Sequence, residues 1–218
     1  MRAPARLAVP ALAVLGVGAA LAFFAGLVAD APALRLATKP FPALALAAWV
    51  ALRSREPLGR LVGAGLLLSS LGDVLLEIGR FLPGLVAFLA AHLAYVSGFV
   101  TAERRLAPAR ALPFLAWGAA ALAAIRPGLG ALAVPVAVYV AVICAMMWRA
   151  SARVGGNGPT AAAAWLGLAG AVAFGASDTL IALDRFAAPL AGVRWPILLL
   201  YWMGQWGIAA SAVCSRPR

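Results

Sequence analysis

Apolar residues form long runs along this chain, and the charged residues lie almost entirely between the runs. A membrane core of roughly 30 Å needs about 20 apolar residues for each crossing helix. Parsed at that length, the chain predicts eight spans with short connections, of which the fifth is short enough to be re-entrant. The expected spans are 7–29, 34–52, 58–78, 81–102, 111–125, 129–149, 160–183 and 192–214. We therefore expect a single transmembrane domain over residues 1–218, an all-α bundle of about eight helices.

The composition supports this interpretation, because 65% hydrophobic residues, 11% charged residues and a mean hydropathy of +0.98 lie outside the soluble range. A net charge of +11 could suggest nucleic acid, but the basic residues are scattered at helix ends and form no stripe with aromatic residues. They are better explained as topology signals and as contacts to anionic membrane lipids. We expect no nucleic-acid partner.

Twelve of the 18 Lys and Arg residues fall on the side of the two termini in this parse. The positive-inside rule then places both termini in the cytoplasm, as in an integral protein of a bacterial inner membrane. The first apolar run is too long for a signal-peptide core, so we expect it to be retained as a span. Cys144 and Cys214 form no CxxC pair and no metal-binding spacing, so we expect no disulfide, metal or cofactor.

Two similar acidic stretches end the third and seventh spans, "GDVLLEIGRF" (72–81) and "SDTLIALDRF" (177–186). They place Asp73 and Asp178 at equal depth, about 9 to 10 Å inside the outer helix ends. The match is compatible with a parallel 4+4 internal repeat, and equally with chance. An ionised acid at the centre of a lipid-facing helix costs roughly 2.5 to 3.5 kcal/mol, which favours function for both aspartates. For Glu77, we expect a local ion pair with Arg80 rather than a catalytic role.

Other polar side chains within spans lie at a similar depth. His92 and Tyr95 share one helix face, Tyr201 and Gln205 are one turn apart, and Lys39 lies near the outer mouth of the second span. Taken singly, each is typical of a hydrogen bond between helices. Together they predict one polar cavity, open to the non-cytoplasmic side or to the lipid near it. The small residues Gly63, Gly65, Gly167 and Gly170 predict close helix packing.

Five stretches carry a resemblance to a known family: "TKPFPALAL" (38–46), "GLLLSSLGDVLLEI" (65–78), "GLVAFLAAHLAYVSGF" (84–99), "GAVAFGASDTLIALDRF" (170–186) and "YWMGQWGIAAS" (201–211). In this order they resemble the YhhN, or lysoplasmalogenase, family of membrane proteins. The resemblance implies an eight-span helical bundle that hydrolyses the vinyl ether bond of lysoplasmalogens. The products would be a fatty aldehyde and glycerophosphocholine or glycerophosphoethanolamine.

The residues found above suit that chemistry. A vinyl ether hydrolyses when an acid protonates its β-carbon and water attacks the resulting oxocarbenium ion, so one protonated and one ionised carboxyl suffice. We expect Asp73 and Asp178 to share these catalytic roles. His92 or Tyr201 would orient the pair, Tyr95 and Gln205 would line the pocket, and Lys39 would meet the phosphate of the lysophospholipid substrate.

Two other classes of function use buried acids. A proton-coupled transporter of a small or lipid-like solute would also place acids and a histidine inside spans. An intramembrane aspartyl protease also uses two aspartates. That family has the motif GxGD around one of them, whereas residues 70–73 of this chain read "SLGD". We therefore expect an ether-bond hydrolase, with the transporter as the alternative.

Overall fold

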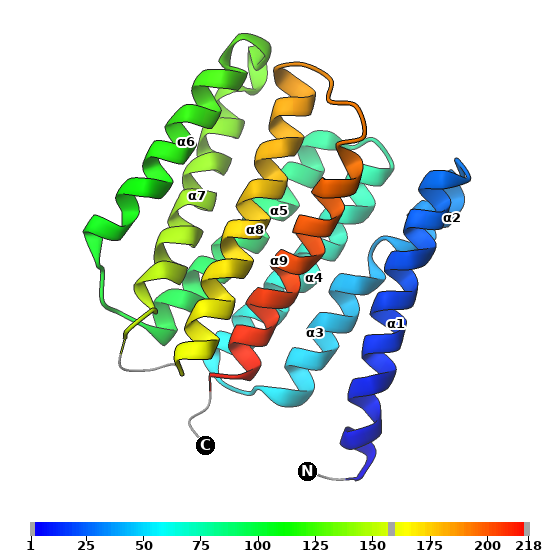
Figure 1. Cartoon of the computed structure of the whole chain (residues 1–218), viewed down its shortest axis with the longest axis vertical. Coiled ribbons are helices and arrows are strands. Elements are labelled where there is room, and N and C mark those ends of the chain that lie inside the picture. Colours follow the sequence, from blue (N-terminus) through cyan, green and yellow to red (C-terminus); the bar gives the residue numbers. More distant parts are fainter. Residues whose placement is uncertain (1–2, 157–159, 216–218) are drawn as a thin grey trace. The chain divides into compact units, whose positions relative to one another are not determined.

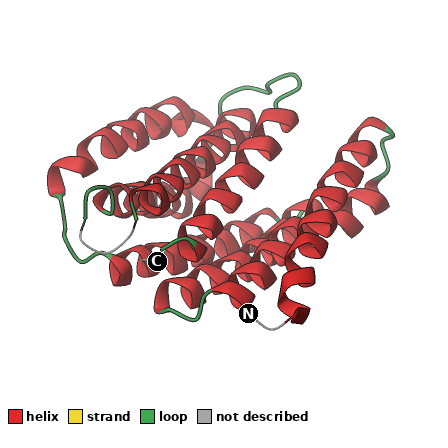
Figure 2. Cartoon of the chain, turned by 60° about the horizontal axis from the view of Figure 1, so that its bottom comes forward, coloured by secondary structure: helices red, strands yellow, loops and turns green. Residues whose placement is uncertain are grey.

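A computed structural model describes residues 3–156 and 160–215, and these residues form helices and loops without a strand (Figure 2). Within the described residues, seven helical segments are long and apolar enough to cross a membrane, which confirms an all-α integral membrane protein. The 4+4 repeat is not confirmed. The α-helices are α1 (Ala3–Val28), α2 (Pro32–Thr38), α3 (Phe41–Arg53), α4 (Pro57–Glu77), α5 (Phe81–Ala102), α6 (Leu112–Ile125), α7 (Ala133–Ala152), α8 (Ala161–Phe186) and α9 (Arg194–Val213).

The chain divides into two compact units, residues 1–95 and residues 96–218, with the boundary inside α5. The first unit contains α1 to α4 and most of α5. The second contains the end of α5 and α6 to α9. The short fifth span is extended by 3-10 turns at both ends of α6 into a 21-residue segment, Pro108–Gly128, which is long enough to cross.

The second span was expected as one helix, but the structure has two, α2 and α3, with a break at Lys39 and Pro40. Pro40 and Pro42 have no N–H, so the carbonyls of Leu36 and Thr38 lose their usual helical donors. The break places Lys39 at a helix end, where its side chain can turn toward α4. It is therefore the feature that brings a cation to the site described below.

Within the first unit, glycines let α5 approach α4 closely. A Cβ on Gly65 would lie 2.3 Å from the ring of Tyr95, and one on Gly72 would lie 2.6 Å from the ring of Phe88. Each ring therefore packs directly on the backbone of α4. These two contacts fix the position of α5 along the axis of α4, beside the turn that carries Asp73.

Within the second unit, α8 and α9 lie side by side along their length (Figure 1). A Cβ on Gly170 would lie 2.7 Å from both the carbonyl oxygen of Gly204 and the amide nitrogen of Ile208. The predicted close packing is thus confirmed at Gly170, as at Gly65. It is wrong at Gly63, where an added Cβ would meet nothing within 4 Å.

Arginines cover the C-terminal end of α7. Arg105 and Arg110 donate to the carbonyls of Ser151, Ala152 and Val154, in the last turn of the helix and directly after it. Arg153 is fully buried and donates to the hydroxyls of Ser211 and Ser215 at 3.2 and 3.0 Å. Burial lowers the pKa of Arg153 to about 10, so the guanidinium is still charged at neutral pH.

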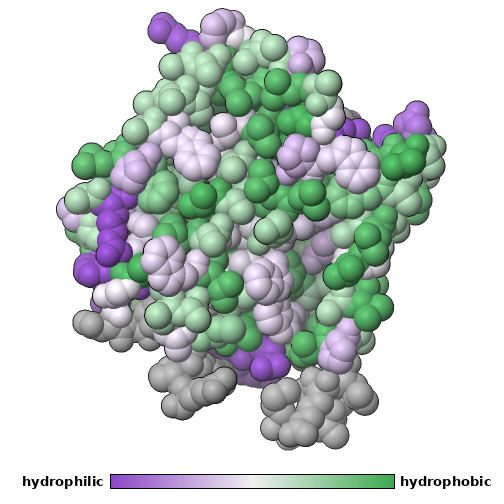
Figure 3. Space-filling model, viewed as in Figure 1, coloured by the Kyte–Doolittle hydropathy of each residue, from purple (hydrophilic) through white to green (hydrophobic). Residues whose placement is uncertain are grey.

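Large hydrophobic side chains are exposed along the helices, among them Leu21, Leu71, Val134 and Met203 at 51 to 73%. Figure 3 shows mostly hydrophobic residues on the face in view. Such a surface suits contact with lipid rather than with water.

Candidate functional site

The predicted acid Asp73 is buried in α4, with only 2% of its surface exposed. It continues a polar stripe along that helix, one turn after Ser69 and one turn before Glu77. The Ser69 hydroxyl lies 3.2 Å from the hydroxyl of Tyr95, and the Ser70 hydroxyl donates to the carbonyl of Pro40 at 3.4 Å. The stripe is therefore hydrogen-bonded to α5 on one side and to the helix break on the other.

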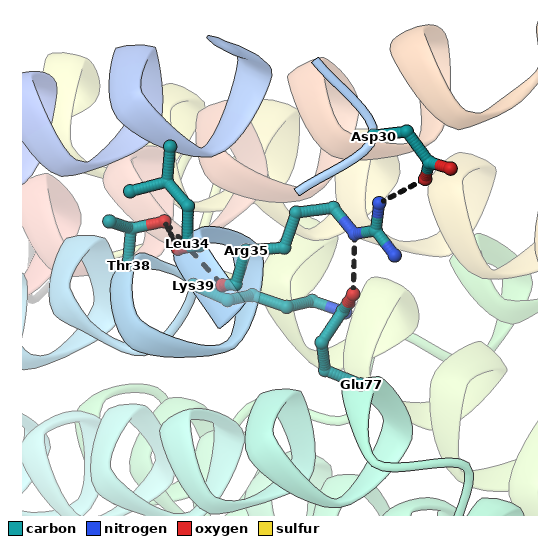
Figure 4. A network of polar contacts seen from close by, with 6 residues as sticks. All are labelled: Asp30, Leu34, Arg35, Thr38, Lys39 and Glu77. Carbon is teal, nitrogen blue, oxygen red and sulfur yellow. Dashed lines mark hydrogen bonds and ion pairs between the residues drawn. The ribbon is translucent and has the colours of Figure 1, made fainter. Parts of the chain in front are cut away.

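At the end of this stripe, Glu77 binds two cations (Figure 4). Its Oε1 accepts from Nε of Arg35, and its Oε2 accepts from Nζ of Lys39, both at 3.0 Å. Arg35 also pairs with the exposed Asp30 at 3.2 Å. The local pair predicted between Glu77 and Arg80 is wrong, because α2 and the break supply the cations instead.

Lys39 directly follows α2, at the break that the sequence did not predict, and its side chain faces a carboxylate rather than open water. Its side chain is 11% exposed, and its Nζ lies 5.7 Å from the centre of the Phe23 ring. The pair with Glu77, which follows Asp73 by one helical turn, and this ring together hold the ammonium in place. Its predicted contact with the substrate phosphate stays a prediction.

His92 and Tyr95 are fully buried on the same face of α5, as their spacing predicted. Nδ1 of His92 lies 2.7 Å from the carbonyl oxygen of Phe88, so Nδ1 is the donor. The His92 and Tyr95 rings meet edge to face at 6.2 Å between centres. In a neutral imidazole this arrangement leaves Nε2 as the acceptor.

In the second unit, Asp178 lies between two side chains that tie α8 to its neighbours. Ser177 donates to the carbonyl of Ile197 in α9 at 2.9 Å, and Thr179 accepts from the indole N–H of Trp117 in α6 at 3.1 Å. Asp178 itself accepts from the hydroxyl of Tyr139 in α7 at 2.8 Å. Three consecutive residues thus contact three different helices, which fixes the position of the carboxylate.

The structure adds Tyr139, which the sequence analysis missed. The chain has three tyrosines, and the other two, Tyr95 and Tyr201, were singled out because another polar residue follows or precedes them at helical spacing. Tyr139 has no such neighbour within its apolar run. A tyrosine hydroxyl inside a span was itself the available signal, since a buried hydroxyl needs a partner.

Tyr201 and Gln205 lie on the buried face of α9. The Tyr201 ring packs edge to face on Phe174 of α8 at 5.2 Å between centres. Phe174 precedes Asp178 by one turn, so Tyr201 packs on the same face of α8 that carries the acid. Their roles as site-lining residues stay predictions.

The predicted site residues divide between the two units. Asp73, Lys39, His92 and Tyr95 belong to the first unit, and the remaining three to the second. The pairing of Asp73 with the second aspartate therefore stays a prediction. Over residues 3–156 and 160–215, no group of three or more His, Cys, Asp or Glu side chains is arranged to hold a metal ion.

Comparison with known proteins identifies relatives over most of the chain. Lysoplasmalogenase TMEM86A of Bos taurus is 37% identical over 168 residues, covering 74% of this chain and 68% of its own length. Lysoplasmalogenase TMEM86B of Homo sapiens is 33% identical over 189 residues, covering 81% and 74%. A lysoplasmalogenase of Mycobacterium bovis is 36% identical over 174 residues, covering 72% and 60%.

No solved structure matches the chain. The model of the YhhN family matches residues 34–212, a range that contains every predicted site residue. The chain belongs to the YhhN family.

Proposed function

We propose that this protein is a lysoplasmalogenase, a membrane hydrolase that cleaves the vinyl ether bond of lysoplasmalogens to a fatty aldehyde and a glycerophospho-alcohol. The observation that carries the proposal is the set of relatives named lysoplasmalogenase, which match at 33 to 37% identity over 72 to 81% of the chain. The two acids inside its helices supply the catalytic groups that this reaction needs.

The proposed mechanism uses Asp73 and Asp178 as a carboxyl pair. One carboxyl, protonated, gives its proton to the β-carbon of the vinyl ether and creates an oxocarbenium ion. The other, ionised, stabilises that positive charge and takes a proton from the attacking water. The hemiacetal that forms then collapses to the aldehyde and the free alcohol. Tyr139 acts as a positioning residue, because its hydrogen bond holds the Asp178 carboxylate in one orientation.

The cations around Glu77 suit the substrate phosphate. In a lysoplasmalogen, the three glycerol carbons separate the phosphate from the vinyl ether. Glu77, which binds both Arg35 and Lys39, follows Asp73 by four residues, about 6 Å along the axis of α4. A phosphate bound there would therefore bring the vinyl ether to Asp73. His92, Tyr95, Tyr201 and Gln205 would shape the surrounding pocket.

The topology belongs to the same proposal. With Lys and Arg concentrated on the side of the termini, both termini face the cytoplasm of a bacterial inner membrane. The substrate would then enter from the non-cytoplasmic side or from the lipid near it.

The test is aldehyde release from a lysoplasmalogen by detergent-purified protein. Wild type should release aldehyde, while Asp73→Asn and Asp178→Asn should not. Asp30→Asn and Asp184→Asn are matched controls, because one carboxyl is exposed and the other only caps the amide of Leu190. Activity retained in Asp73→Asn and Asp178→Asn would rule out the carboxyl pair. A folded wild type without activity would rule out the hydrolase.

One observation favours a second candidate, a proton-coupled transporter. The break between α2 and α3 puts Lys39 at an interrupted helix, a feature that transporters use at their binding sites. Transport predicts uptake of the lipid into sealed vesicles without cleavage. Recovery of intact lysoplasmalogen inside the vesicles would favour it over hydrolysis.

A further inference from the structure

A groove of about 780 Å³ lies between α3 and α4 in the first unit, beginning at the loop that joins the two helices. This volume is within the range of roughly 300 to 1,000 Å³ for small-molecule sites. Small residues such as Ala47, Ala51 and Ala64 line most of it. The groove is thus apolar along the helices and has the size of a lipid-like ligand.

Gly63 keeps the groove open. A Cβ added at this residue of α4 would meet nothing within 4 Å, although the residue lies in the middle of a membrane helix. Gly59, one turn earlier, differs, because a Cβ there would lie 2.3 Å from the Ser54 hydroxyl. The side chain of Ser54 therefore fills the space over Gly59, and the space over Gly63 stays available.

The loop end of the groove is polar. Ser54 lines it, is only 5% exposed, and its hydroxyl has no hydrogen-bond partner within the described residues. A buried hydroxyl of this kind normally has a partner, and the polar part of a ligand in the groove would supply one. The hydroxyl marks the place where the polar part of a ligand would begin.

Two arginines line the same end. Arg60 donates through Nε to the carbonyl of Arg55 at 3.0 Å, which fixes the loop, and the Arg55 side chain is exposed. Guanidinium groups bind phosphate with several parallel donors. An apolar groove that ends in a free hydroxyl and two arginines is complementary to an amphiphile with an anionic head.

We propose that this groove binds an anionic glycerophospholipid of the surrounding bilayer. One hydrocarbon chain lies against the small residues of α3 and α4, an ester oxygen meets Ser54, and the phosphate lies at Arg55 and Arg60. This site is distinct from the proposed active site. Thirteen helical residues separate Arg60 from Asp73, about 20 Å along α4, so a substrate phosphate held here would keep its vinyl ether far from that acid.

A helix from a second copy of the chain is the other conceivable occupant, because Gly59 and Gly63 form a GxxxG spacing. Two features of the structure oppose it. Ser54 covers Gly59, so only one of the two glycines has the open backbone that close helix pairing needs. Two copies meeting here would also bring their arginines together.

Native mass spectrometry of detergent-purified protein tests the proposal, with phosphatidylglycerol and phosphatidylcholine of equal chain length as probes. Arg55→Gln should weaken retention of phosphatidylglycerol about fivefold, the effect of one basic residue at a membrane surface. Gly63→Leu should reduce retention of both lipids by filling the groove. The matched controls are Arg80→Gln, an exposed arginine in the loop that follows α4, and Gly18→Leu, an open glycine of α1 outside the groove.

Retention that is equal in wild type, Arg55→Gln and Gly63→Leu would overturn the proposal. So would an equal loss in Arg80→Gln, which would indicate general attraction to a cationic protein. Dimers that dissociate in Gly63→Leu while lipid retention is unchanged would identify a second copy as the occupant. The measurement contains no lysoplasmalogen, so its result does not depend on the proposed hydrolase activity.

Discussion

Substituting alanine at Gly170 and at Gly63 should change stability in opposite directions. Both glycines lie inside membrane helices, and the substitution is the same. At Gly170 the new Cβ would lie 2.7 Å from backbone atoms of Gly204 and Ile208, which cannot rotate away as a side chain can. At Gly63 it would meet nothing within 4 Å.

The expected magnitudes follow from two opposing effects. Overpacking costs about 1 to 3 kcal/mol, and rigid backbone contacts on both sides place Gly170 at the upper end of that range. In a helix interior, alanine is more stable than glycine by about 1 kcal/mol, which offsets part of that cost. The net loss for Gly170→Ala is then about 2 kcal/mol, whereas Gly63→Ala gains up to about 1 kcal/mol.

Thermal unfolding in one detergent, followed by circular dichroism, measures the difference. At about 2 to 4 °C for each kcal/mol, Gly170→Ala should melt about 4 to 8 °C below wild type and Gly63→Ala about 2 to 4 °C above it. Gly170→Ala melting at or above the wild-type temperature would refute the backbone contact between α8 and α9. A loss in Gly63→Ala would refute the open space on α4.

Three further changes test the polar contacts. Glu77→Gln should lower the melting temperature more than Asp30→Asn, because it leaves two half-buried cations without their shared carboxylate, whereas the Asp30 side chain is 94% exposed. Tyr139→Phe should reduce aldehyde release by about 10-fold or more while the melting temperature changes little, since it removes one hydrogen bond that orients Asp178; unchanged release would exclude a positioning role. Arg153→Lys should destabilise the protein measurably in the same melting assay, because one ammonium does not reproduce the planar contacts to two serine hydroxyls.

The apolar runs were sufficient to predict the membrane helices, because burial in lipid acts on every residue of a run. The break in the second run was not predicted, since hydropathy does not register a missing N–H. Pro40 and Pro42 were visible in the sequence and were the signal for it. Close packing at glycines was predicted at Gly63 and Gly65 alike, but only the partner helix decides whether a ring or open space faces each one.

Polar contacts between residues close in sequence were predicted, whereas those between distant residues were not. The shared face of His92 and Tyr95 follows from local spacing and was predicted correctly. The partner of Glu77 was predicted wrongly, because local spacing favoured Arg80 whereas the true partners lie 38 and 42 residues away. Such contacts depend on which helices pack together, which no pattern within one helix reveals.

Each unit carries one of the two aspartates on a helix that its neighbours hold in place. Asp73 lies on a helix whose neighbours are fixed by glycine contacts and by the cations around Glu77. Asp178 is fixed through its own hydrogen bond and through those of the residues on either side of it. Catalysis by proton transfer needs carboxyls that are already oriented when the substrate arrives. The hydrogen bond from Tyr139 supplies part of that orientation for Asp178, so loss of Tyr139 should let the Asp178 carboxyl reorient.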